Sequence, residues 1–230
     1  MLSVTEGWRF GRDQPEAKWK EERRLETAEK LAREAVALDV GDYDTHWALA
    51  NVLINTGRWD EAIACFERAL YLGRGENNPS LLVDMADALV HAGQIDRALT
   101  MLRHARRIPD WHRWVAAWAY YAKGRADPWF YDLALEELRA TYWQPGETRH
   151  LADLKLLEAA IHARRAGAQG ARKSGSPRDA DERSSTALRQ FRERPELGRW
   201  NLDTARRFAP FRDAQDMEHW LEGCRLAGLD

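Results

Sequence analysis

Residues 47–70 read WALANVLINTGRWDEAIACFERAL, and this stretch is the clearest indication of the fold. Two apolar runs with helical spacing flank a short segment around Gly57, which predicts two helices joined by a tight turn. Glycine supplies the backbone freedom that such a turn needs. Asp60 lies just before the second run, where an acidic side chain can cap free amides and favour the helix dipole.

The same helix–turn–helix unit recurs with a period of about 34 residues. Alanines mark one fixed point of its second helix, at Ala28, Ala62, Ala98 and Ala134. A second series repeats the spacing at Ala35, Ala69 and Ala105, and glycines precede the helix at Gly57, Gly93 and Gly124. A small side chain at a fixed point lets neighbouring helices approach closely, where a larger one would overpack the contact. The pattern predicts an all-α array of stacked hairpins.

The segment from Trp47 to Leu70 resembles a tetratricopeptide repeat (TPR). Its departures are modest, because Ala50 stands where that family usually has Gly and Arg74 where it usually has Pro. The resemblance implies a right-handed α-solenoid of about four helix–turn–helix repeats with a C-terminal capping helix. It also implies that the chain binds another protein or a peptide along a concave groove.

We expect a single array over residues 1–230. The expected parts are a partial repeat at 15–39, complete repeats at 43–73 and 79–109, further repeats at 110–141 and 150–194, and a cap at 213–226. A mobile loop is predicted at 167–183, because that segment is rich in Gly, Ser, Arg and Asp and lacks apolar periodicity. In the cap, Met217, Trp220, Leu221 and Cys224 form one apolar stripe that would close the open end of a solenoid.

Several pieces of the chain resemble, more specifically, the C-terminal repeat module of bacterial class III adenylate/guanylate cyclases and related regulators. They are AVALD at 35–39, PDWHRW at 109–114 with AYY at 119–121, FRERPE at 191–196, and the ending that runs from PFRD at 210–213 to WLEGCRLAGL at 220–229. In that family the module follows an effector domain and serves protein interaction or regulation. The resemblance implies a fragment of a longer effector protein, or a lone descendant of such a module.

Composition argues against several classes of partner. The formal net charge of -2 gives no reason to expect a nucleic-acid or membrane-surface protein. No apolar run approaches the length of a membrane span. The two cysteines, Cys65 and Cys224, form neither a disulfide framework nor a metal motif, so we expect a cytoplasmic protein.

Residues with catalytic or metal-binding spacing are not found. The seven histidines lie in separate helices or at helix ends, without the close pair and third ligand of a zinc site. The segment GAQGARKS at 167–174 lacks the Gly before Lys and the strand that a phosphate-binding loop requires. No nucleophile with a base and an orienting group can be assembled. We therefore expect no cofactor, no metal and no enzymatic activity.

The resemblance also implies which residues line the groove, since the first helix of each repeat faces it. These residues are Asp44, Trp47, Asn51, Asn55, Asp87, His91, Trp111, Trp114, Trp118, Tyr121, Arg164 and Arg165. Some relatives clamp a C-terminal carboxylate with Lys, Asn and Arg at such positions. Trp47 and Asp87 depart from that pattern, so this ligand is not expected.

An aromatic stripe in the third repeat has two interpretations. Trp111, Trp114, Trp118 and Tyr121 share one helix face by their spacing. They could form a binding hot spot. Alternatively the chain could fill its own groove, with the insertion around Trp129 or the segment 200–211 against these rings. An alternative function is a small-molecule sensor or enzyme with a pocket at this Trp-rich repeat. The partner's identity and the oligomeric state stay open at this point.

Overall fold

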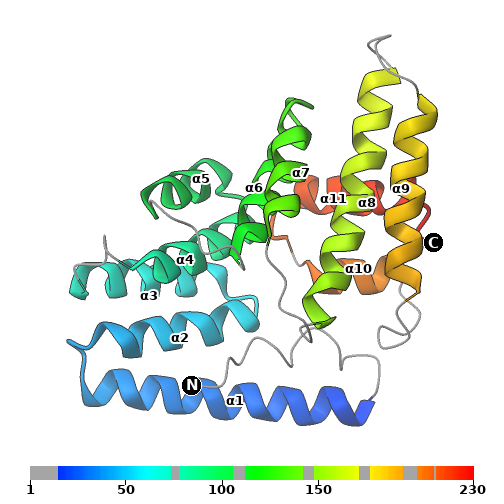
Figure 1. Cartoon of the computed structure of the whole chain (residues 1–230). Helices are drawn as coiled ribbons and strands as arrows, with labels where there is room; N and C mark the ends of the chain where they lie inside the picture. Colours follow the sequence, from blue (N-terminus) through cyan, green and yellow to red (C-terminus); the bar gives the residue numbers. More distant parts are fainter. Residues whose placement is uncertain are drawn as a thin grey trace. The chain divides into compact units, whose positions relative to one another are not determined.

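The structure is a computed structural model that describes residues 15–73, 78–105, 112–141, 148–170, 177–193, 201–209 and 211–230 (Figure 1). Within these ranges the chain forms helices and no strand, which confirms the predicted all-α, TPR-like fold class. The helices are α1 (Pro15–Leu38), α2 (Tyr43–Asn55), α3 (Trp59–Leu72), α4 (Pro79–His91), α5 (Ile95–His104), α6 (Arg113–Lys123), α7 (Phe130–Ala140), α8 (Thr148–Gly170), α9 (Pro177–Arg192), α10 (Leu202–Phe208) and α11 (Ala214–Leu226).

Contacts group the helices into two compact units, Met1–Ile108 and Pro109–Asp230. Unit 1 holds α1 to α5, and unit 2 holds α6 to α11. The sequence predicted one array over residues 1–230, whereas the contacts show two groups. Helices α2 and α3 lie within residues 43–73, and α4 and α5 lie within residues 79–109, the ranges of the two complete repeats in the prediction.

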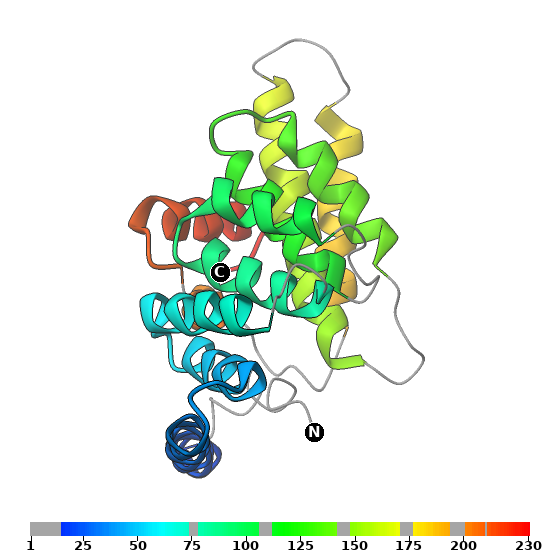
Figure 2. The same ribbon diagram turned by 90° about the vertical axis from the view of Figure 1, so that its left-hand side faces the viewer.

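In unit 1 each helix packs on the next one along the chain, from α1 to α5 (Figures 1 and 2). The recurring alanines lie at these contacts, because Ala62, Ala69 and Ala98 are completely buried. Gly57 and Gly93 have φ angles of 72° and 77° at the hairpin turns, a left-handed conformation that favours glycine. Both features of the repeat therefore have the structural roles that the sequence predicted.

Ion pairs connect the second helices of successive repeats in unit 1. Arg58 at the start of α3 contacts Glu29 of α1 and Glu61 of α3. Arg97 of α5 lies 2.7 Å from Glu67 of α3. Exposed pairs of this kind contribute little stability each, so the buried alanine contacts carry most of the packing.

Unit 2 consists of two hairpins, α6–α7 and α8–α9, and a C-terminal pair of helices. Helix α11 packs on α8 and on α6, and α10 packs on α11. Asp213 caps α11 by accepting hydrogen bonds from the amides of Gln215 and Asp216, at 2.8 and 3.0 Å. The capping helix was predicted at nearly these bounds, whereas α10 was not predicted.

The predicted mobile loop at 167–183 has helix at both of its ends, and residues 171–176 lie outside the described residues. Helix α8 continues through Gly167 to Gly170, and α9 already begins at Pro177. The missing apolar periodicity misled the prediction, because local signals favour a helix here. Proline is well suited to a first helical position, and Pro177 occupies that position in α9.

Two helical glycines offer a matched test of this assignment. A Cβ added at Gly167 meets nothing within 4 Å, so Gly167→Ala should raise the free energy of unfolding by about 0.5–1 kcal/mol. At Gly223 in α11 the same Cβ would lie 2.3 Å from Oη of Tyr121 and 3.1 Å from Cβ of Ala160. Gly223→Ala should therefore lower the free energy of unfolding by about 1–3 kcal/mol. Urea denaturation measures both, and effects of the same sign would contradict the packing described.

Candidate functional site

A polar cluster spans the first helices of the two repeats in unit 1. Trp47 of α2 donates a hydrogen bond from Nε1 to Oδ2 of Asp84 on α4, at 2.8 Å. Asn51, one turn further along α2, approaches the same oxygen with Nδ2 at 3.4 Å. Trp47 and Asn51 were predicted to line a groove, and the structure brings them together around a carboxylate that the prediction omitted. Asp84 lies on α4 about one turn before the predicted groove residue Asp87, and a charge on the apolar helix PSLLVDMADALVH was the available signal.

The environment of Asp84 changes its acidity. Burial raises the pKa of this carboxyl to about 6, and the hydrogen bond from Trp47 opposes the rise. The charge of Asp87, one turn away on α4, raises the pKa further. Asp84 therefore changes protonation state near pH 6, and its bonds to Trp47 and Asn51 strengthen when it ionises.

Other predicted groove residues of unit 1 lie deeper. Asp87 and His91 on α4 are buried, with Oδ1 and Nε2 3.5 Å apart. Trp59 of α3 stacks on the His91 ring with centroids 5.1 Å apart. Asn55 is also buried, and it donates to the Asn51 carbonyl at 2.8 Å. These three residues support the hairpin rather than present a surface.

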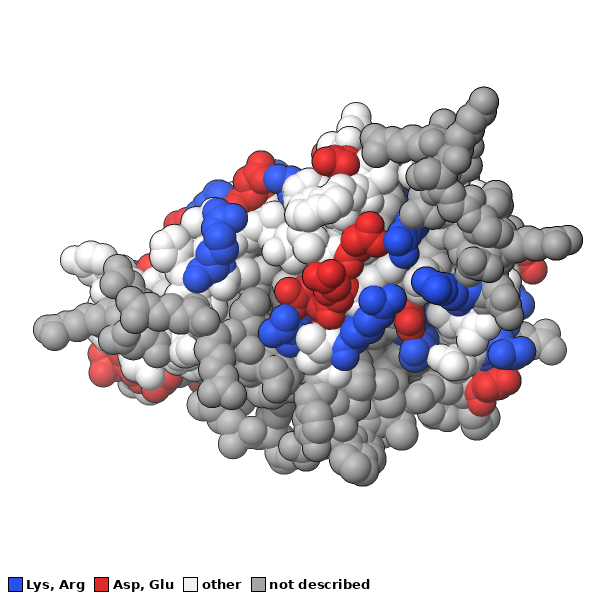
Figure 3. Space-filling model, turned by 45° about the horizontal axis from the view of Figure 1, so that its top comes forward, with Lys and Arg blue, Asp and Glu red and all other residues white. Residues whose placement is uncertain are grey.

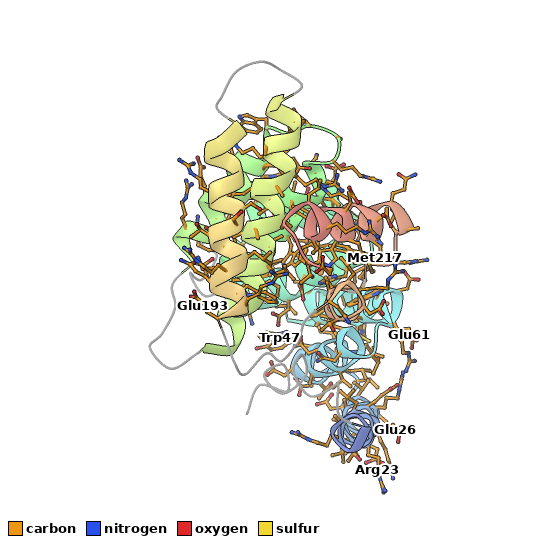
Figure 4. All side chains as sticks on the ribbon, turned by 90° about the vertical axis from the view of Figure 1, so that its right-hand side faces the viewer. Arg23, Glu26, Trp47, Glu61, Glu193 and Met217 are labelled. Atoms are coloured by element: carbon orange, nitrogen blue, oxygen red, sulfur yellow. The ribbon has the colours of Figure 1, made fainter. Side chains whose placement is uncertain are left out.

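The accessible part of the predicted set in unit 1 is therefore small. Asp44 is exposed, and Trp47 and Asn51 are half-buried, as is Asp84. We call these four residues the α2–α4 face. Figure 4 labels Trp47, which lies on α2. The face combines an aromatic ring, an amide and two carboxylates.

In unit 2 the chain covers its own aromatic stripe. Trp118 and Tyr121 of α6 are almost fully buried. The Trp118 ring contacts Phe211 and Trp220, with centroids 5.6 and 4.8 Å apart. Tyr121 packs on His219 at 4.8 Å. Of the two interpretations of the stripe, burial supports the internal core for these residues, which corrects their assignment to an accessible groove.

The segments that cover the stripe are partly those expected. Phe211 belongs to the segment that was considered, whereas Trp220 and His219 come from α11. Trp129, the other predicted cover, is 57% exposed. Trp114 is half-buried, and Trp111 lies outside the described residues.

Arg164 and Arg165 of α8 also act within unit 2. Arg164 donates from Nη2 to the carbonyl of His219 at 2.7 Å, and Tyr121 donates from Oη to the same oxygen at 3.0 Å. Arg165 pairs with Asp132 of α7 at 2.9 Å. The two arginines were predicted as groove residues, but these contacts engage them in holding α11 and α7 against α8.

Two buried histidines in unit 2 are held neutral. Burial lowers the pKa of His219 to about 3, and the nearby positive charge of Arg164 lowers it further. Burial likewise lowers the pKa of His162 on α8 to about 4. Tyr131 lies with its Oη 3.2 Å from Nε2 of His219. A charged imidazole is therefore disfavoured at both positions.

We expect the free energy of unfolding to fall as the pH is lowered from about 6.5 to 4. Each folded-state pKa is depressed, so each histidine contributes stability that is present above about pH 6.5 and is lost as the pH falls toward the folded pKa. The maximal slope is about 1.4 kcal/mol per pH unit for each histidine. Asp84, with its raised pKa, acts in the opposite direction over about pH 4–6.

Urea denaturation at pH 7, 6, 5 and 4.5 measures this dependence. His162→Gln should reduce the slope by up to about 1.4 kcal/mol per pH unit, the contribution of one histidine, since that proton no longer distinguishes the folded from the unfolded chain. The comparison cancels the contribution of Asp84, which both proteins share. A variant with the same slope as the wild type would show that His162 is not the group responsible.

In the described part of the chain, no group of three or more His, Cys, Asp or Glu side chains could hold a metal ion. Burial raises the pKa of the Cys65 and Cys224 thiols, so neither is an activated nucleophile. Acidic and basic side chains lie next to each other on the face in Figure 3, in keeping with the small net charge. Among the described helices, none combines the length and the apolar character needed to cross a membrane.

Repeated hairpins with glycine turns and buried alanine contacts define a helical-repeat protein. Comparison with protein families agrees, because residues 41–109 match the family described as Tetratricopeptide repeat. The match spans less than a third of the chain and includes α2 to α5. It supports a tetratricopeptide-repeat protein, a class that generally serves as a scaffold for protein interaction. No curated protein and no solved structure matches the chain.

Proposed function

We propose that this chain binds another protein or a peptide through the α2–α4 face of unit 1. The observation that carries the proposal is the hydrogen bond of Trp47 to Asp84, which joins the first helices of the two matched repeats. The bond fixes the indole of Trp47 at its Nε1 atom. A tryptophan held in this way is suited to anchor a partner, because a rigid aromatic ring buries a large area at low entropic cost.

The polar groups of the face indicate what kind of segment it accepts. Neither α2 nor α4 contains Lys or Arg, so the face offers no cation to a carboxylate ligand. Asp44 and Asp84 instead favour a neutral or basic segment. Asn51 could form hydrogen bonds with polar groups of that segment, either as donor or as acceptor. A partner segment with an apolar side chain for Trp47 and hydrogen-bond donors nearby fits this arrangement.

The proposed role is that of a scaffold or regulatory module in the cytoplasm. The ending carried by α11 supports a relation to the interaction modules of class III cyclases. The free thiols of Cys65 and Cys224 support a reducing compartment. The alternative, a sensor or enzyme with a pocket at the Trp-rich repeat, is less well supported because Trp118 and Tyr121 are covered by the chain itself.

A display library of random peptides, selected on the purified chain, tests the proposal. Affinities of selected peptides are then measured by fluorescence anisotropy. Asn51→Ala and Asp44→Lys should each weaken binding about tenfold or more. Tyr71→Ala is the matched control, because Tyr71 is 77% exposed on α3 and lies outside the α2–α4 face. Equal losses in all three variants, or in the control alone, would place binding elsewhere.

A further inference from the structure

Arginines from three helices of unit 2 gather near the buried side chain of His162 on α8. They are Arg139 in the last turn of α7, Arg165 on α8 and Arg183 on α9. Burial is the largest cause of the lowered pKa of His162, and the positive charges of these arginines lower it further, so each guanidinium group lies near the imidazole. We call Arg139, Arg165 and Arg183 the arginine cluster.

Contacts between the helices hold the cluster in place. Ser184, which follows Arg183 on α9, is buried and donates a hydrogen bond from Oγ to the carbonyl of Ala159 on α8, at 2.9 Å. On the other side, Nη2 of Arg165 lies 2.9 Å from Oδ1 of Asp132 on α7. Both α7 and α9 pack on α8, and Figure 1 shows α8 and α9 side by side. The backbone positions of the three arginines are therefore set by helix packing.

The charges of the cluster are only partly balanced. Arg165 has its ion pair with α7, and Glu158, whose charge opposes the effect of the arginines on the imidazole, has Oε2 2.6 Å from Nζ of Lys155. Arg139 and Arg183 are exposed, and within the described ranges no carboxylate forms an ion pair with either of them. Two positive charges thus remain for an anion that carries two negative charges.

We propose that the arginine cluster binds a phosphate group on a side chain of a partner protein. A phosphorylated side chain carries a charge of about −2 and three acceptor oxygens, which matches two guanidinium groups. Guanidinium forks also bind phosphate oxygens in pairs, with a fixed geometry. Arg139 and Arg183 come from the two helices that flank α8, so they can contact the phosphate from two sides. The proposal does not depend on what the α2–α4 face binds.

The surroundings of the cluster favour a single phosphate over a membrane or a nucleic acid. Asp132 and Glu158 carry negative charges beside it, so the positive charge is confined to a small area. A nucleic acid or an anionic membrane needs several cations over a broad face. A free small molecule needs a concave site that encloses it. Exposed guanidinium groups instead suit a phosphate that a partner protein presents.

Nuclear magnetic resonance of the histidine rings in the whole chain detects an anion at the cluster. Sodium phosphate is added at pH 7 and at constant ionic strength, with sodium chloride as the reference salt. The His162 resonance should shift with phosphate and reach saturation, because the anion comes close to this ring. His104, which is exposed on α5, is the internal control and should not shift in this way. A His162 resonance that responds no more than that of His104 would overturn the proposal.

Peptides then distinguish a phosphorylated partner from free phosphate. A pool with one fixed phosphoserine and random neighbours should bind at least about tenfold more tightly than the same pool with serine, as measured by fluorescence anisotropy. Arg139→Gln and Arg183→Gln should each remove most of this preference and keep the helicity of the wild type. Arg189→Gln is the matched control, because Arg189 lies on α9, is 68% exposed and does not act on the pKa of His162.

The remaining outcomes would contradict the proposal. Equal binding of the two pools, together with a response to inorganic phosphate, would show an adventitious ion only. A loss of preference in Arg189→Gln as large as in Arg183→Gln would show a general effect of positive charge. Vesicles of phosphatidylcholine and phosphatidylserine provide the last comparison. If they bind the chain more tightly than the phosphoserine pool does, the cluster serves a membrane surface instead.

Discussion

Trp118→Ala should lower the free energy of unfolding by about 3–5 kcal/mol. Trp118 is 2% exposed, and its ring meets Phe211 and Trp220 in the core of unit 2. Removing the indole would leave a large cavity between α6 and the C-terminal segment, and the surrounding helices can only partly collapse into it. Urea denaturation followed by circular dichroism measures the loss.

Trp114→Ala is the matched control on the same helix. Because Trp114 is half-buried, its replacement should cost clearly less than that of Trp118. The comparison also decides between the two interpretations of the aromatic stripe. A Trp118→Ala protein as stable as the wild type would mean that the stripe is not core, and an accessible aromatic groove would have to be reconsidered.

Deleting residues 213–230 should cause the chain to aggregate. The deletion removes α11, whose Trp220, Leu221 and Cys224 are buried against the rest of unit 2. It would expose Trp118 and Tyr121 as one apolar surface, which promotes association. Light scattering and the fluorescence of a hydrophobic dye measure the effect.

The control for this deletion keeps α11 and replaces one exposed residue of that helix. Arg225→Ala removes exposed ion pairs with Glu218 and Glu222 and should leave solubility unchanged. Adding a synthetic peptide of residues 213–230 to the truncated chain should restore solubility, since the peptide supplies Trp220 and the rest of α11. A truncated protein that stays monomeric without the peptide would show that α11 is dispensable.

Much of the helical organisation could be predicted, because each hairpin is encoded within about 34 residues. Gly57 and Gly93 mark the turns, and Ala62 and Ala98 mark the contacts. The error at 167–183 arose where apolar spacing was the only criterion. A helix that is polar on most sides still forms when its end residues are favourable, and Pro177 at the start of α9 is such a residue.

The candidate site was predicted in part. Trp47 and Asn51 were placed on one face from the repeat register, and the structure adds Asp84 as the group that both contact. The bond crosses from α2 to α4, residues 37 positions apart. Asp84 was missed because the predicted set followed repeat positions and did not consider which side chains meet across the two helices.

The sequence by itself determined the fold class and the hairpin turns at Gly57 and Gly93, because these depend on short-range spacing. The tertiary structure decided which aromatic residues are surface and which are core. Tyr121 donates its hydrogen bond to the carbonyl of His219, 98 residues away. Helical spacing shows that Trp118 and Tyr121 share a face, but no local pattern shows that α11 returns to cover it. That contact forms only when the apolar stripes of distant helices exclude water together.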